Sequence, residues 1–203
     1  MAFRASGAFR RDMVHVGSTL LFAATVSGAA HAGTLSVPAG ALRTDGTIAG
    51  AGVVVSGSGI GAGSGSITDD VTLAAGGTLA PGGAAAVGVL DAVGLAWQAG
   101  GAIAIRLGAN DAASDQLVLS GLLSRQGTGS FQFRFDDGAT PPTAGATYTL
   151  IRFAGQSGFD ATDFSYVYAG SASALVGQFR LDPDALRFVV ISTPVELQSF
   201  EVD

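Results

Sequence analysis

The stretch Val71-Thr-Leu-Ala-Ala-Gly-Gly-Thr-Leu-Ala-Pro-Gly-Gly83 contains the pattern that governs much of this chain. Short runs with apolar residues at alternate positions are separated by glycine pairs. Alternation with a period of two is typical of β-strands, and glycine pairs are typical of tight corners that need positive φ. The stretch therefore predicts short strands joined by tight corners, with no helix.

The same pattern extends back to Gly33, with spacers that are unusually rich in glycine. A weak repeat is visible, since Gly33-Thr-Leu recurs as Gly65-Ser-Ile and Gly46-Thr-Ile recurs as Gly77-Thr-Leu. Repeated short strands with small corners are typical of a solenoid, in which each coil buries its face against its neighbours.

From Val87 onward the predicted strands lengthen and alternate cleanly. Ser130–Asp136 is the clearest, with Phe131, Phe133 and Phe135 expected to point inward. Near the end, two runs flank Asp182-Pro183-Asp184, which predicts an antiparallel hairpin.

We therefore predict an all-β protein: a short Gly-rich parallel β-helix or solenoid-like stack, closed by longer strands and a C-terminal antiparallel hairpin. The alternative is a β-sandwich or jelly roll built from residues 87–191. The expected parts are a cleaved signal peptide (1–32), a Gly-rich short-strand solenoid segment (33–86), a longer-stranded β domain (87–191) and a C-terminal tail (192–203).

The first 32 residues have the features of a secretory leader. Arg4, Arg10 and Arg11 precede an apolar run, and Ala30-His31-Ala32 has the small residues of a cleavage site. A transmembrane anchor is the competing interpretation, but serines, threonines and a glycine dilute the run. We expect cleavage after Ala32 and a secreted or cell-surface protein, with the periplasm as an alternative. No later stretch predicts a transmembrane segment in the mature chain.

The composition after the leader excludes several kinds of chemistry. No histidine, cysteine, lysine or methionine follows Ala32. The usual imidazole bases, thiolate nucleophiles and nitrogen or sulfur metal ligands are therefore absent from this part of the chain. Seven arginines face fifteen acidic residues there, which argues against a nucleic-acid partner. We expect no catalytic residue, no metal site and no cofactor.

Three pairs of aspartates are the candidates for calcium binding or for carboxylate catalysis. They are Asp69-Asp70, Asp136-Asp137 and Asp182 with Asp184. Calcium binding needs several carboxylate or carbonyl oxygens, and glycoside hydrolysis needs two carboxylates across a cleft. Neither an EF-hand nor a calcium-binding nonapeptide is present. Solvated turns are the favoured interpretation of these pairs.

Aromatic residues suggest a carbohydrate-binding site. Trp97 is the single tryptophan, and Phe164, Tyr166 and Tyr168 alternate along one predicted strand. If exposed, these rings would stack on sugars. If they point inward, they belong to the core.

Residues 71–155 resemble the β-strand repeat of autotransporter passenger domains. The resemblance rests on Gly77-Thr-Leu-Ala-Pro-Gly82, Ser114-Asp-Gln-Leu-Val118 and Tyr148-Thr-Leu-Ile151. It implies a right-handed parallel β-helix that is exported, often to the cell surface, with adhesive or stalk-like roles and no assigned catalytic residue. The membrane barrel of that family is lacking, so we expect a free exported protein or a fragment.

The leading functional hypothesis is an exported, non-enzymatic structural or adhesion protein of a surface or matrix. A secreted carbohydrate-binding module and a polysaccharide-active β-helix enzyme that uses aspartates are the alternatives. Expected partners are a cell-surface polysaccharide or a protein. The oligomeric state is left open by the sequence.

Overall fold

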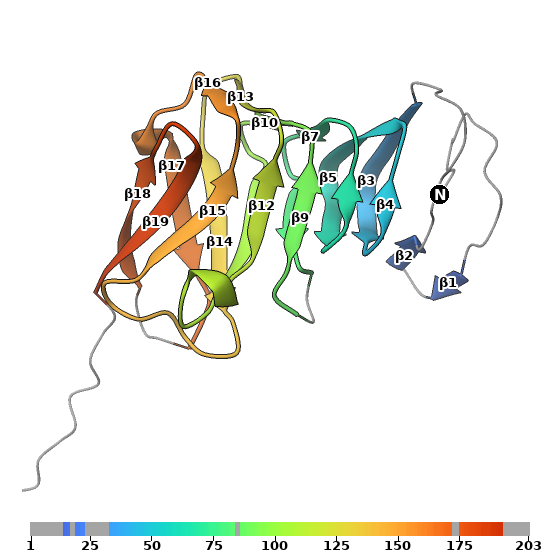
Figure 1. Cartoon of the computed structure of the whole chain (residues 1–203). Helices are drawn as coiled ribbons and strands as arrows, with labels where there is room; N and C mark the ends of the chain where they lie inside the picture. Colours follow the sequence, from blue (N-terminus) through green and yellow to red (C-terminus); the bar gives the residue numbers. More distant parts are fainter. Residues whose placement is uncertain (1–13, 17–18, 23–32, 84–85, 172–174, 193–203) are drawn as a thin grey trace, which may run out of the picture.

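Strands make up most of the computed structural model, which describes residues 14–16, 19–22, 33–83, 86–171 and 175–192 (Figure 1). Within those ranges the only helices are two short 3-10 turns, η1 (Asp111–Ala113) and η2 (Ala161–Asp163). The all-β prediction is therefore confirmed. None of the helices in the described ranges is long and apolar enough to cross a membrane.

Twelve of the described strands form one large, predominantly parallel sheet. At its centre lies β5 (Ala51–Gly63), whose first half pairs with β7 and whose second half pairs with β8. The sheet continues from β7 and from β8 as two separate branches of parallel strands. The opposite edge of β5 pairs with β3, which pairs in turn with β2, and β2 pairs with β1. The first branch is β7 (Val71–Leu73), β10 (Leu95–Gln98), β13 (Leu122–Gln126) and β16 (Gly155–Ser157); the second is β8 (Thr78–Pro81), β11 (Ala102–Leu107), β14 (Phe131–Asp137) and β17 (Phe164–Tyr168); the remaining strands are β3 (Gly33–Thr44), β2 (Thr19–Phe22) and β1 (Val14–Val16).

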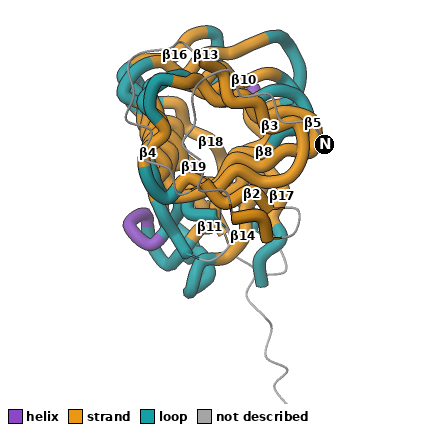
Figure 2. The backbone as a smooth tube through the Cα atoms, turned by 90° about the vertical axis from the view of Figure 1, so that its right-hand side faces the viewer, coloured by secondary structure: helices purple, strands orange, loops and turns teal. Residues whose placement is uncertain are grey.

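Seven strands form a second, mixed sheet that lies against the open side of the large one (Figures 1 and 2). Five of them pair in parallel, and the last two add on in antiparallel fashion as a hairpin. In order across the sheet they are β18 (Val176–Leu181), β19 (Ala185–Ser192), β15 (Thr147–Arg152), β12 (Gln116–Leu119), β9 (Val89–Ala92), β6 (Ser66–Ile67) and β4 (Thr47–Ile48).

Side chains from both sheets fill the interior. Alternate residues of each strand point inward, as on Phe131, Phe133 and Phe135, which are at most 1% exposed, so the inward prediction for these three is confirmed. At the other end the interior is filled by smaller residues such as Val53 and Val55. One continuous apolar core therefore runs the length of the molecule.

The predicted architecture was wrong. The protein is a large parallel half-barrel sheet plus a mixed sheet; it is neither a β-helix stack closed by longer strands nor a sandwich or jelly roll. Parallel pairing is not confined to the Gly-rich segment, since the long strands β11, β14 and β17 also pair in parallel. Alternation in a sequence shows which face of a strand is buried, but it specifies neither the partner nor the direction of pairing.

Part of the predicted leader lies beside the body of the protein. Backbone pairing places β2 parallel to the end of β3, with Thr19 opposite Ala41 and Phe22 opposite Thr44. Cleavage after Ala32 stays a prediction. The predicted tail from residue 193 lies outside the described residues.

Candidate functional site

Trp97 lies in the core. Its side chain is fully buried, and its indole Nε1 donates a hydrogen bond to the Gly101 carbonyl at 3.1 Å. Phe131 and Phe133 meet the ring edge-on, with centroids 5.6 and 5.3 Å away. Neither face of the indole is available to a sugar ring in this structure, so Trp97 gives no support to the carbohydrate site.

The three aromatic residues of β17 are not an open platform either. Phe164 is 7% exposed and stacks on Phe159 with centroids 5.0 Å apart. The half-buried Tyr166 donates its hydroxyl proton to the Leu175 carbonyl at 2.9 Å and accepts from the Gly177 amide at 3.1 Å. The Tyr168 hydroxyl donates to Asp137. Both hydroxyls thus anchor neighbouring loops, and the predicted set of four does not form one exposed face.

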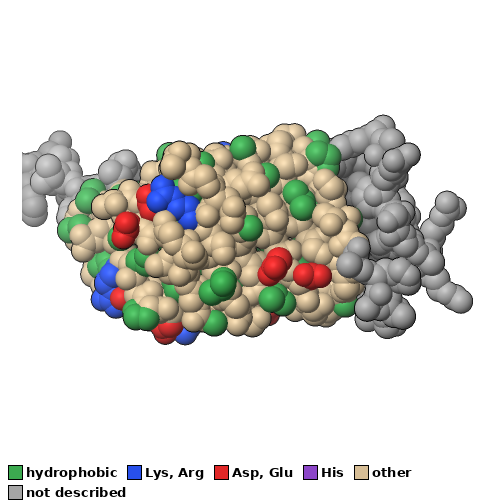
Figure 3. All heavy atoms as spheres, turned by 90° about the horizontal axis from the view of Figure 1, so that it is seen from above, with side chains coloured by type: hydrophobic (Ala, Val, Ile, Leu, Met, Phe, Trp, Pro, Cys, Tyr) green, Lys and Arg blue, Asp and Glu red, His purple; other side chains and the backbone are tan. Residues whose placement is uncertain are grey.

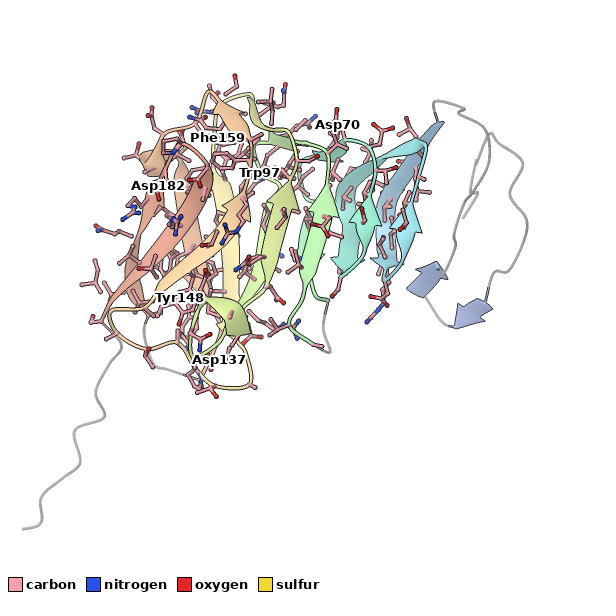
Figure 4. The ribbon with its side chains drawn as sticks, in the orientation of Figure 1. Asp70, Trp97, Asp137, Tyr148, Phe159 and Asp182 are labelled. Carbon is pink, nitrogen blue, oxygen red and sulfur yellow. The ribbon has the colours of Figure 1, made fainter. Side chains whose placement is uncertain are left out.

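The aspartate pairs lie on separate parts of the molecule. In Figure 4, Asp70 is near the top, Asp137 is at the bottom and Asp182 is at the far left end. Among the described residues, no three acidic, histidine or cysteine side chains come close enough to hold a metal ion. The geometry therefore brings no two of these three pairs together across a cleft.

Asp137 organises the loop that follows β17. Its carboxylate accepts hydrogen bonds from the Tyr168 hydroxyl and from both the amide and the hydroxyl of Ser171. Partial burial raises the pKa of Asp137, but the hydrogen bonds from Ser171 and Tyr168 outweigh it, so the pKa lies below its usual value. A carboxylate satisfied in this way positions a loop, and it is a poor proton donor.

Asp115 and Arg106 form an ion pair that sequence reasoning missed. Asp115 is 2% exposed, and its carboxylate accepts hydrogen bonds from the Arg106 amide at 2.9 Å and from Arg106 Nε at 3.0 Å. The Gly88 amide donates to the other oxygen at 2.8 Å. Desolvation raises the pKa of Asp115 despite these bonds. The signal in the sequence was an aspartate directly before an apolar strand, with an arginine in the strand before it.

A cavity lies where η2 meets the β18–β19 hairpin. It has a volume of about 540 Å³, and Figure 4 shows Phe159 and Asp182 at this end of the molecule. Its walls mix carboxylates, an amide and apolar groups. The lining residues are Gln156, Phe159, Asp160, Ala161, Leu181, Asp182 and Pro183.

Asp182 is electrostatically satisfied at the edge of this cavity. Arg180 donates to its carboxylate from Nε at 2.9 Å and from Nη2 at 2.8 Å, and Arg187 Nε lies 2.8 Å from Oδ2. The hydrogen bond from Arg180 is the main reason that the pKa of Asp182 lies below its usual value. The cavity therefore offers hydrogen-bonding groups, and the carboxylates of both Asp160 and Asp182 are among the groups that line it.

A smaller hollow of about 260 Å³ lies on the mixed sheet, across β6, β9 and β12. Hydroxyls of Ser66, Thr68 and Ser120 and the carboxylate of Asp91 line it, together with aliphatic groups. These are the groups of an ordinary polar sheet surface.

Comparison with protein-family models gives no match to this chain, and no curated protein matches its sequence. Function must therefore be argued from the geometry.

Proposed function

We propose that this chain is an exported structural or adhesive protein of a cell surface or matrix, without enzymatic activity. The observation that supports this proposal best is that several carboxylates of the chain are bound by other groups of the same protein. The carboxylates of Asp115, Asp137 and Asp182 each bind groups of the protein itself. These charged groups make contacts within the protein, which suits a structural role.

The outer surface is consistent with recognition by shape. Figure 3 shows a face on which charged side chains are few and scattered, between small hydrophobic spots and uncharged atoms. Exposed large apolar side chains such as Leu122 and Ile191 occur, but they belong to different sheets. Such a surface fits a partner through hydrogen bonds and close packing more than through charge attraction.

Export belongs to the same proposal and rests on the sequence of residues 1–32. Without cysteine, the exported chain would obtain its stability from paired strands and a packed core and from no disulfide bond. The proposed partners are a surface polysaccharide or a surface protein.

A carbohydrate-binding role is the second candidate, and the 540 Å³ cavity is the observation that favours it. Its amide and carboxylate groups, from Gln156, Asp160 and Asp182, are of the kind that hydrogen-bond sugar hydroxyls. A polysaccharide-cleaving enzyme has less support. The three aspartate pairs lie on separate parts of the molecule, and of the two carboxylates in the cavity, Asp182 is already bound by Arg180 and Arg187.

The test uses protein produced by an exporting bacterial host. Its mass determines whether residues 1–32 are removed. Immobilised polysaccharides and surface-protein extracts then report binding, and released reducing ends report cleavage. Binding without cleavage supports the proposal, whereas release of reducing ends or retention of the leader contradicts it.

Two variants separate the candidates. Asp160→Asn changes the cavity wall, and Asp70→Asn is its matched control at an exposed carboxylate elsewhere. Loss of polysaccharide binding in Asp160→Asn alone assigns binding to the cavity and favours the carbohydrate module. Equal binding by both variants favours recognition by the wider surface.

A further inference from the structure

The two ends of the molecule are closed in different ways. At the C-terminal end, β18 folds back over the interior, and Phe179 packs on Phe133, Phe164 and Phe188 with centroids 5.3 to 5.6 Å apart. The hairpin that covers this end belongs to the body of the protein. Both β18 and β19 lie after residue 175, so no processing of the N-terminus removes them.

At the N-terminal end, the last long strand of the body is β3. Its inner side pairs with β5 along most of its length, and its outer side pairs with β2 over Ala41–Thr44. Within the described residues, no other strand pairs with the outer side of β3. The strand that covers this edge therefore comes from residues 19–22, which lie inside the predicted leader.

Removal of residues 1–32 would leave β3 as a bare edge. An edge strand presents unpaired amides and carbonyls that accept another strand, and proteins usually protect such edges with charges, prolines or bulges. On β3, Pro38 and the register shift between Val37 and Ala39 interrupt pairing at one point. Residues 39–44 lie beyond that interruption, and β2 pairs with the last four of them, Ala41–Thr44.

Charge also distinguishes the two ends. Residues 33–68 contain one arginine and one aspartate, Arg43 and Asp45, which pair with each other. Residues 69–192 contain eleven aspartates and six arginines. Two copies that meet at the N-terminal end bring together neutral surfaces, whereas contacts through the rest of the body bring together surfaces of the same net sign.

We propose that residues 19–22 are a removable cover of the β3 edge, and that the chain without residues 1–32 pairs with a second copy, β3 against β3. The inference rests on the export step of the proposed function. Pairing of identical edges gives a closed, two-fold dimer, whereas a head-to-tail contact would continue into filaments. The dimer places the two hairpin ends outward, which gives an adhesive protein two equivalent distal ends.

The test uses the full chain with residues 26–32 replaced by the recognition sequence of a specific protease. Light scattering and native mass spectrometry follow the folded protein before and after cutting. We expect a monomer before cutting, then release of the N-terminal fragment and a species of twice the mass of the cut chain. A cut chain that stays monomeric, retains the fragment, forms filaments or unfolds contradicts the proposal.

A charged residue at the edge provides the specific control. Ala41→Lys adds a charge at a partly exposed position of β3 within the segment that β2 covers, and Gln178→Lys adds the same charge at an exposed position of β18. We expect the cut Ala41→Lys chain to be monomeric and the cut Gln178→Lys chain to be dimeric. Dimers of both would place the contact elsewhere.

Because the added protease makes the cut, this result does not depend on natural processing. If the exporting host leaves residues 1–32 in place, the export proposal fails while the behaviour of the edge is still measured.

Discussion

The Gly-rich end of the molecule (residues 33–67) and its aromatic cluster are built by opposite means. The Gly-rich end has small buried side chains and glycines against which neighbouring backbones pack. A Cβ added at Gly59 would lie 1.9 Å from the Val37 carbonyl oxygen, and one at Gly65 would lie 2.1 Å from that of Gly46. The aromatic cluster consists of Trp97, Phe131, Phe133, Phe135, Phe159, Phe164, Tyr166, Phe179 and Phe188.

The difference teaches how a chain without disulfides stabilises two ends of one core. Large rings bury more apolar area per residue, and their edge-to-face contacts add to it. Glycine allows close approach of strands but contributes no side chain to the core. We therefore expect the aromatic cluster to supply most of the free energy of unfolding, and the Gly-rich end to tolerate side chains only where space exists.

The largest expected effect comes from Trp97→Ala. Loss of this fully buried ring leaves a cavity among Phe131 and Phe133, and we expect the free energy of unfolding to fall by about 3–5 kcal/mol. Urea denaturation followed by circular dichroism measures it. Val55→Ala is the counterpart at the Gly-rich end and should cost less, because fewer atoms are removed. An equal or larger cost for Val55→Ala would reverse the comparison.

Asp115→Asn tests the buried ion pair that joins β11 to the start of β12. Arg106 then loses its charged partner while 17% of its side chain is exposed, and we expect a loss of about 3 kcal/mol in the free energy of unfolding. Asp91→Asn, at an exposed position of β9, is the control and should change it little. Equal stability of the two variants would show that the pair contributes little.

Gly59→Ala tests close backbone approach at the Gly-rich end. Its Cβ would collide with the Val37 carbonyl, and we expect a loss of about 1–3 kcal/mol. Gly46→Ala is the matched control, because a Cβ there meets nothing within 4 Å. Thermal unfolding of both variants measures the difference, and the prediction fails if they unfold at the same temperature.

The smallest effect concerns pH. The pKa of Asp137 lies below its ordinary value of 3.8, so the folded state binds this proton less readily than the unfolded state. The stabilisation is present above pH 3.8 and is lost as the pH falls through the lower, folded-state pKa. Unfolding curves of Asp137→Asn should show a weaker dependence on pH in this acid range.

Asp136→Asn changes the neighbouring carboxylate and is the control for that experiment. It should retain the pH dependence of the unmodified chain, since Asp137 still binds Tyr168 and Ser171. A pH profile of Asp137→Asn that matches the unmodified chain would mean that this carboxylate does not stabilise the loop after β17.

Only part of the candidate site could be predicted from the sequence. The sequence drew attention to the aromatic residues, but a lone tryptophan in an alternating strand is compatible with either face until its neighbours are known. Asp182 was noticed as part of a turn, yet its contact with Arg187 depends on the register between β18 and β19. The cavity depends on η2 meeting that turn, and no local pattern encodes this contact between distant segments.

The sequence by itself determined that the chain is all-β and that Phe131, Phe133 and Phe135 point inward, because both follow from local alternation and from the positions of glycine and proline. Tertiary structure alone decided that long and short strands share one parallel half-barrel sheet, and that a mixed sheet closes it. Strand direction and partner choice depend on contacts between residues far apart in the chain, and many pairings satisfy the same local pattern.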